Sequence, residues 1–143
     1  MDSVYMNNFR GFSKTVVPIR SVNFFVGENS TGKSSLLALL ELLSRPEFWF
    51  NLDFNAGTYQ FGAYRDIVSA LSDDHSEFQI GLCRHNQKDP KDSVCYLLHF
   101  REAKDGIPQL ARFSQLCQSY HATLRVSDKQ IAARINLEVP AFS

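Results

Sequence analysis

The sequence predicts an α/β domain that continues into an antiparallel β-meander, and three observations predict it. A mostly apolar run at residues 22–26 precedes a glycine-rich turn. A run of helix formers at residues 34–43 follows that turn. From residue 78 onward, apolar side chains recur at every second position, the period of a strand with one buried face. At 143 residues, 44% hydrophobic and 21% charged, the chain has the composition of one globular domain.

The segments before the glycine-rich turn predict strands. Residues 4–19 carry extended-type residues on both sides of Gly11, with a proline at position 18, and this pattern is typical of a β-hairpin or a pair of edge strands. Residues 22–26 are mostly apolar and bounded by turn residues, as expected for a strand buried on both faces of a sheet.

A buried helix is predicted after the turn. Residues 34–43 are strong helix formers, and their apolar positions cover nearly the whole circumference. Pro46 should end this helix, because proline cannot continue the hydrogen-bond ladder. Farther on, Tyr64, Ile67, Val68 and Leu71 share one helical face and predict a short amphipathic helix.

The last part of the chain predicts a β-meander. Phe78, Ile80 and Leu82 alternate with polar or small residues, and the alternation returns at residues 94–100, which favours an antiparallel hairpin. Residues 124–126 and 131–137 suggest two more strands, whereas residues 110–116 fit either a helix or an irregular strand. We therefore predict one partial domain over residues 1–143, divided into residues 1–47, 48–72 and 73–143.

Charge, cysteine content and hydropathy narrow the functional classes. Fifteen basic and fifteen acidic residues give a formal net charge of zero, so no global field attracts the chain to nucleic acid or to an anionic membrane, although a local basic patch stays open. No apolar run is long enough to span a bilayer, and we expect a cytoplasmic protein without membrane contact. The three cysteines, Cys83, Cys95 and Cys117, are expected to be reduced packing residues.

Arginines are spread along the predicted strands of the second half. The interpretation that fits this pattern is solvated strand faces, in which the aliphatic stems cover the sheet and the charges face water. These residues are Arg84, Arg101, Arg112, Arg125 and Arg134.

The motif that carries chemistry is Gly27-Glu28-Asn29-Ser30-Thr31-Gly32-Lys33-Ser34, which matches the phosphate-binding P-loop pattern. Gly27 and Gly32 allow backbone conformations that turn successive N–H groups inward as a nest for phosphate oxygens. The positive end of the following helix points at the same place. The competing interpretation is a glycine turn before a helix with an exposed lysine.

Each polar position of the motif has a predicted role with a nucleoside triphosphate. Lys33 would reach the β and γ phosphates and is the catalytic candidate. The Ser34 hydroxyl would be one ligand of magnesium, and Ser35 would donate to the α phosphate. The remaining loop residues, Glu28, Asn29, Ser30 and Thr31, would surround the phosphates. The sequence thus predicts ATP or another nucleoside triphosphate with Mg²⁺ as the ligand, and it leaves ATP and GTP undistinguished.

A family resemblance joins this motif to the start of the chain. Asn7-Asn8-Phe9-Arg10-Gly11-Phe12, a short strand and then the P-loop resemble the amino-terminal lobe of the ATP-binding-cassette (ABC) ATPases related to the RecF, SMC and OLD families. The similarity is closest to AAA-type ATPases of bacterial defence systems. The P-loop of these families commonly has Asn at the place of Asn29, and many relatives have Gly where this chain has Ser30.

The resemblance suggests two more site residues. Arg10 would contact phosphate, with a surface arginine on an edge strand as the alternative. Residues 59–68 resemble the segment that carries the Q-loop glutamine, so Gln60 would be a second residue near the metal, with a solvated loop glutamine as the alternative. Phe9 and Phe12 could stack on a base, although aromatic residues in a short strand belong more often to a core.

The second half of such an ATPase is not recognisable in the sequence. No Ser-Gly-Gly signature, Walker B strand with its catalytic Glu, or switch His is found, and Asp73 and Asp74 follow a predicted helix. The resemblance therefore implies an ATP-Mg²⁺ binding lobe whose hydrolysis requires a missing second half and a dimer partner, acting on DNA or controlling an effector nuclease in anti-phage defence. The alternatives are a non-catalytic nucleotide-sensing or interaction module and a small P-loop kinase with an arginine-rich lid.

Overall fold

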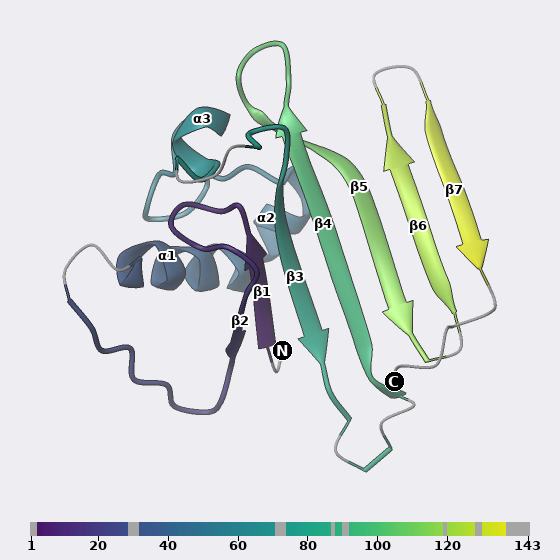
Figure 1. Cartoon of the computed structure of the whole chain (residues 1–143), viewed down its shortest axis with the longest axis horizontal. Coiled ribbons are helices and arrows are strands. Elements are labelled where there is room, and N and C mark those ends of the chain that lie inside the picture. The colour runs from purple at the N-terminus through teal and green to yellow at the C-terminus, as the bar shows by residue number, and fades with distance from the viewer. Residues whose placement is uncertain are drawn as a thin grey trace.

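The fold is a seven-stranded antiparallel sheet with helices over one face, as Figure 1 shows. It is taken from a computed structural model that describes residues 3–28, 32–70, 74–86, 88–89, 92–118, 120–127 and 130–136. The strand order is β2-β1-β3-β4-β5-β6-β7. The strands are β1 (Ser3–Asn7), β2 (Thr15–Pro18), β3 (Phe78–Arg84), β4 (Val94–Glu102), β5 (Pro108–Cys117), β6 (His121–Val126) and β7 (Ile131–Asn136), and the helices are α1 (Lys33–Ser44), α2 (Pro46–Asn51) and α3 (Tyr64–Ile67).

The first strands confirm the predicted hairpin around Gly11. β1 and β2 pair antiparallel, with Val4 opposite Val17. The other edge of β1 pairs with β3, where Met6 lies opposite Ile80. β1 thus joins the beginning of the chain to the meander, and both Val4 and Met6 are fully buried.

Helix α1 confirms most of the predicted buried helix. Its first intrahelical bond runs from the Leu36 N–H to the Gly32 carbonyl, and Leu39 and Leu42 are fully buried. Leu37 is 53% exposed, so α1 keeps a solvent side despite its all-round apolar sequence. Pro46 follows the end of α1 as predicted, and it also begins α2, where its missing N–H costs nothing.

An aromatic cluster joins the helices to the sheet. Phe54 lies at its centre, with ring centroids 5.0 Å from Phe100, 5.4 Å from Phe48 and 5.5 Å from Phe78. Phe9 reaches the same cluster through Phe78, at 5.8 Å. Edge-to-face packing of this kind adds to the free energy of apolar burial. Phe9 is therefore a core residue and does not stack on a base.

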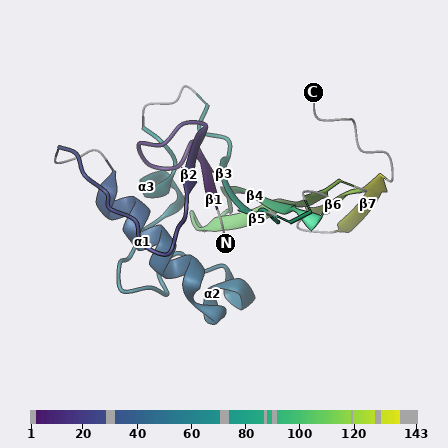
Figure 2. The same cartoon turned by 90° about the horizontal axis from the view of Figure 1, so that it is seen from below.

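The meander follows the predicted strands and resolves the ambiguous one. β3, β4, β6 and β7 occupy the segments with alternating side chains, and residues 108–117 form β5, a strand whose pairing with β4 shifts register between His99 and Phe100. Leu137, which belonged to the predicted last strand, lies outside the described residues. Figure 2 shows α1 and α2 on one side of the sheet and the strands up to β7 extending away from them.

The prediction of a buried strand over residues 22–26 is wrong in this structure. The described segment 19–28 contains no strand, and Phe24 and Val26 are 87% and 90% exposed. The physical reason is that no described strand pairs with this segment, so its backbone has no ladder and its side chains have no second layer to contact. Phe25, on the opposite side, packs partly against the core.

Two smaller expectations also change. Cys83 and Cys95 are joined by a disulfide, because the β3–β4 register places them directly opposite each other. The expectation of three reduced cysteines is therefore wrong for this pair. α3 ends at Ile67, so the predicted helix is a single turn, and Leu71 lies outside the described residues. Among the described residues, no helix has the length and apolar character needed to cross a membrane.

Candidate functional site

A cavity of about 440 Å³ lies at the beginning of α1. Three segments form it: the turn between β1 and β2, the first turn of α1, and the stretch from α3 onward. The lining residues are Arg10, Gly11, Gly32, Lys33, Ser34, Ser35, Arg65, Asp66, Val68 and Ala70. The structure therefore brings the predicted Arg10 and the described end of the P-loop into one cavity, although more than twenty residues separate them in the sequence.

Backbone hydrogen bonds hold the first and third segments together. The Arg10 N–H donates to the Ile67 carbonyl at 2.7 Å, and the Ser69 N–H donates to the Asn8 carbonyl at 2.9 Å. An isolated β-bridge pairs Phe9 with Val68 between these two bonds. The turn that carries Arg10 is thus fixed against the end of α3 by main-chain contacts, which position the wall of the cavity without depending on flexible side chains.

Gly32 is required at the start of α1 for two reasons. Its φ of +88° lies in the region that glycine adopts readily. In addition, a Cβ at this position would lie 2.8 Å from Cζ of Phe12, which is too close for a real contact. Gly27 also has a positive φ, 153°. The prediction that these glycines permit unusual backbone conformations is confirmed.

Lys33 contacts its own loop. Its Nζ donates to the Gly27 carbonyl at 2.7 Å and to the Glu28 carbonyl. The ammonium therefore lies over the loop, and its contact with phosphate stays a prediction. Asn29, Ser30 and Thr31, the other predicted loop residues, lie outside the described residues. Ser34 is exposed and Ser35 half-buried, and both line the cavity.

Arg10 is half-buried, so it is more than a surface residue of an edge strand. Its Nη2 donates to the Phe61 carbonyl at 3.1 Å and to the Tyr59 hydroxyl at 3.4 Å. The guanidinium carbon also lies 5.9 Å and 5.7 Å from the centroids of the Tyr59 and Phe61 rings, within cation–π range. Its Nε is one of two buried polar side-chain atoms without a hydrogen-bond partner among the described residues.

Gln60 does not line this cavity. Its side chain is exposed, although its neighbours Tyr59 and Phe61 both contact Arg10. The contacts of Arg10 thus place the residue 59–61 segment beside the cavity wall, and a metal-binding role for Gln60 stays a prediction. Among the described residues, no group of three or more His, Cys, Asp or Glu side chains could hold a metal ion.

Arg65 and Asp66 also line the cavity, although neither was predicted as a site residue. Asp66 accepts a hydrogen bond from the Ala63 N–H at 2.9 Å and so caps α3. A Cβ at Gly62 would lie 2.6 Å from Oδ2 of Asp66, so Gly62 leaves room for this carboxylate. Asp66 carries the one carboxylate among the described residues of the lining. Both residues lie in the segment that resembles the Q-loop region, and this resemblance was the one sequence feature that could have indicated them.

A comparison with known families covers this site. A sequence profile of the AAA ATPase domain matches residues 1–125, a range that includes every residue of the cavity lining. No curated protein matches the chain. No solved structure matches it either.

Proposed function

Because the chain belongs to the AAA ATPase domain family, we propose that the cavity at the start of α1 binds the phosphates of ATP together with Mg²⁺. Membership of the family implies nucleotide binding. The observation that supports the location is the convergence of Arg10, Lys33 and the first turn of α1 on one cavity. The finer description, a P-loop lobe of the ABC type, rests on the resemblance to RecF, SMC and OLD ATPases.

The cavity has the charge and shape that phosphate requires. Among the described lining residues, three are cations, Arg10, Lys33 and Arg65, and one is a carboxylate, Asp66. α1 is twelve residues long, and its free N–H groups present a positive partial charge at its beginning. A Cβ at Gly32 would collide with the ring of Phe12, so only glycine allows this backbone conformation at the wall of the cavity.

Lys33 is positioned to exchange partners. In this structure its ammonium donates to two carbonyl oxygens of residues 27 and 28. A charged phosphate oxygen is a stronger acceptor than a carbonyl, so the same ammonium would turn to a bound triphosphate. The Ser34 hydroxyl would be a ligand of magnesium, which neutralises phosphate charge when bound. A magnesium ion held in this way needs no cluster of protein carboxylates, because phosphate oxygens and water complete its ligands.

We infer that this lobe does not hydrolyse ATP without further groups. Asp66, the carboxylate of the described lining, is engaged in capping α3, so it is not free to position a water molecule. The proposed active form is a dimer, as in the ATPases that the chain resembles.

The biological setting is proposed from the resemblance alone. Action on DNA, control of an effector nuclease, a defence role and a cytoplasmic location all follow from the RecF, SMC and OLD likeness. The second candidate function is a non-catalytic nucleotide sensor, which is favoured by the engagement of Asp66. Self-association that requires a nucleotide but releases no phosphate would select the sensor.

Calorimetric titration with a non-hydrolysable ATP analogue and Mg²⁺ tests the proposal. We expect saturable binding by the native protein and loss of at least about tenfold in affinity for Lys33→Ala, because a charge-assisted hydrogen bond is worth roughly 1.5–3 kcal/mol. The matched control is Lys14→Ala, which removes an exposed lysine that does not line the cavity. A parallel titration with a GTP analogue decides the base preference.

Two results would contradict the proposal. One is no binding by a protein whose circular dichroism spectrum shows a folded state. The other is equal binding by the Lys33→Ala and Lys14→Ala variants, which would separate nucleotide binding from the P-loop.

A further inference from the structure

The side of the sheet opposite α1 and α2 carries a second hollow, of about 630 Å³. Its lining residues come from strands β4, β5, β6 and β7, which lie side by side in Figure 1. We call this surface the open face. Its residues are Leu97, His99, Arg112, Ser114, Leu116, His121, Thr123, Arg125, Ala132, Ala133, Arg134 and Asn136. None of them lines the cavity at α1, so the two surfaces are separate.

The open face concentrates positive charge. Among the described residues, three arginines and no Asp or Glu line the hollow, although the whole chain has equal numbers of acidic and basic residues. Arg125 and Arg134 are exposed, and neither has an ion pair within the described part of the chain. The interpretation of scattered, individually solvated arginines therefore misses that the sheet register gathers three of them.

The register places like charges side by side. Arg112 lies directly opposite Arg125 across β5 and β6, and Thr123 lies opposite Arg134 across β6 and β7. Two like charges directly opposite each other destabilise a sheet. Glu77 lies 3.7 Å from Nη2 of Arg112 and offsets part of this repulsion. Arg125 and Arg134 have no such partner in the described part of the chain, so an anion beside them would lower the repulsion that remains.

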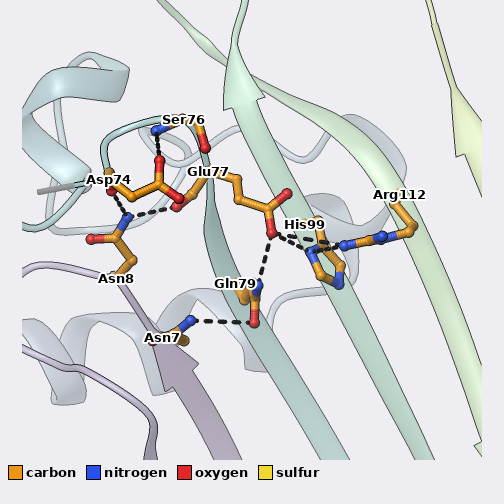
Figure 3. Close-up of polar contacts among 8 residues, drawn as sticks. All are labelled: Asn7, Asn8, Asp74, Ser76, Glu77, Gln79, His99 and Arg112. Carbon is orange, nitrogen blue, oxygen red and sulfur yellow. Dashed lines mark hydrogen bonds and ion pairs between the residues drawn. The ribbon is translucent and has the colours of Figure 1, made fainter. Parts of the chain in front are cut away.

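The floor below the arginines carries hydroxyl groups beside apolar side chains such as Leu97 and Leu116. Ser114 and Thr123 are cross-strand partners, and their hydroxyls lie 3.3 Å apart. His99 is buried at the edge of the hollow. Its Nδ1 lies 2.8 Å from Nη2 of Arg112, and this contact holds the guanidinium group in place (Figure 3). Hydroxyls and guanidinium groups are the donors that bind phosphate oxygens in protein–nucleic acid contacts.

We propose that the open face binds the phosphodiester backbone of nucleic acid. The arginines lie on three successive strands, about 4.8 Å apart from one strand to the next, so they extend over a distance that suits repeated phosphates better than one phosphate group. Contacts of this kind hold the backbone and carry no direct sequence information. The inference deepens the proposed action on DNA and rests on that part of the proposed function.

The test measures fluorescence anisotropy of a labelled single-stranded DNA, a duplex DNA and an RNA with the native protein, without nucleotide. We expect the Arg125→Ala/Arg134→Ala double variant to bind roughly tenfold more weakly at low salt. The slope of log K against log salt should fall by about 2 in magnitude, because each lost phosphate contact contributes about one. The three probes identify which nucleic acid the surface prefers.

The matched control is Arg20→Ala/Arg84→Ala, which removes the same charge at two exposed arginines outside the hollow. It should keep the native salt slope. The Arg134→Glu variant should weaken nucleic-acid binding more than removal of the Arg134 side chain does, because it reverses the charge. It therefore detects a contribution of Arg134 even if truncation to alanine has a small effect. Calorimetry with the ATP analogue should give native affinity for the open-face variants, so that a failure of this inference and a failure of the nucleotide proposal are separate results.

Three outcomes would overturn the inference. The native protein binds none of the three probes, the two double variants bind equally, or polyglutamate displaces the nucleic acid at equal charge concentration. The last outcome would assign the surface to an acidic protein partner.

Discussion

Gly32 combines a backbone and a packing requirement at one position. Its φ is +88°, and the ring of Phe12 occupies the space where a Cβ would stand, 2.8 Å away. We expect Gly32→Ala to lower the free energy of unfolding by roughly 1–3 kcal/mol, because a residue with a Cβ is strained in this region and the ring must move. Urea unfolding followed by circular dichroism measures the change.

Gly11 provides the control for this prediction. No atom lies within 4 Å of a Cβ built at Gly11, and its φ is not positive. Gly11→Ala should therefore change stability by less than about 0.5 kcal/mol. Equal losses in the two variants would show that the constraint at Gly32 is not specific.

Some residues of the cavity lining could be predicted because they belong to a local sequence motif. The P-loop spacing identified Gly32, Lys33 and Ser34 without any knowledge of tertiary contacts. Arg65 and Asp66 could not be identified in this way, because they line the cavity only through bonds between residues 8–10 and 67–69. The metal-binding roles of Ser34 and Gln60 stay predictions.

Among the elements, the start of β3 is joined to β4 and β5 by a polar cluster with His99 at its centre (Figure 3). Nδ1 of His99 lies 2.9 Å from Oε1 of Glu77 and 2.8 Å from Nη2 of Arg112. A single ring nitrogen cannot donate to the carboxylate and accept from the guanidinium at the same time. Burial lowers the pKa of His99, while the hydrogen bond and charge of Glu77 oppose that change and the charge of Arg112 adds to it.

The pKa of Glu77 is also lowered. Burial raises its pKa, but hydrogen bonds from His99 and Gln79 and the charge of Arg112 outweigh the burial, so the pKa lies below the ordinary value. Both groups therefore bind protons less readily in the folded protein than in the unfolded chain. A depressed pKa gives stability that is complete above the unfolded pKa and is lost as the pH falls toward the folded one.

We expect the urea midpoint to fall as the pH decreases below about 6.5, the ordinary pKa of histidine, and to fall further below about 4.3, where Glu77 begins to contribute. His99→Gln keeps a donor and an acceptor at this position but does not titrate. Between about pH 6.5 and 5, the urea midpoint of this variant should change less with pH than that of the native protein. Equilibrium unfolding across this range measures both profiles.

An exposed histidine, His75, provides the matched variant for this measurement. His75→Gln replaces an exposed histidine and leaves the contacts of His99 with Glu77 and Arg112 intact, so it should keep the part of the pH profile that comes from the cluster. If both histidine variants flatten the profile equally, the cluster is not the source of the pH dependence.

Most strands could be predicted from sequence because their side chains alternate. The period of two locates β3, β4, β6 and β7, because successive side chains of a strand point to opposite faces. In β3 and β4 this alternation separates core residues from outward ones, whereas every residue of β7 is exposed. The strand predicted at residues 22–26 is wrong because apolar content alone does not provide a pairing partner. The Cys83–Cys95 disulfide could not be predicted, because it depends on the exact register of β3 against β4.

On the scale of the whole molecule, the sheet separates two surfaces. α1 and α2 cover one side, the aromatic cluster lies beneath them, and the cavity with the P-loop residues lies at the beginning of α1. The open face lies on the other side of β4–β7. The sequence could predict the meander but not the place of β1 between β2 and β3, because that pairing joins residues about 75 positions apart.

Hydrogen–deuterium exchange with Mg²⁺ and a non-hydrolysable ATP analogue would locate the bound nucleotide on the protein. We predict that the analogue slows exchange in peptides covering residues 8–11, 27–36 and 64–70, whose segments form the cavity at α1. Peptides from β5, β6 and β7 should be unchanged. Protection restricted to the meander, with no change at residues 27–36, would show that the nucleotide does not bind in the cavity at α1.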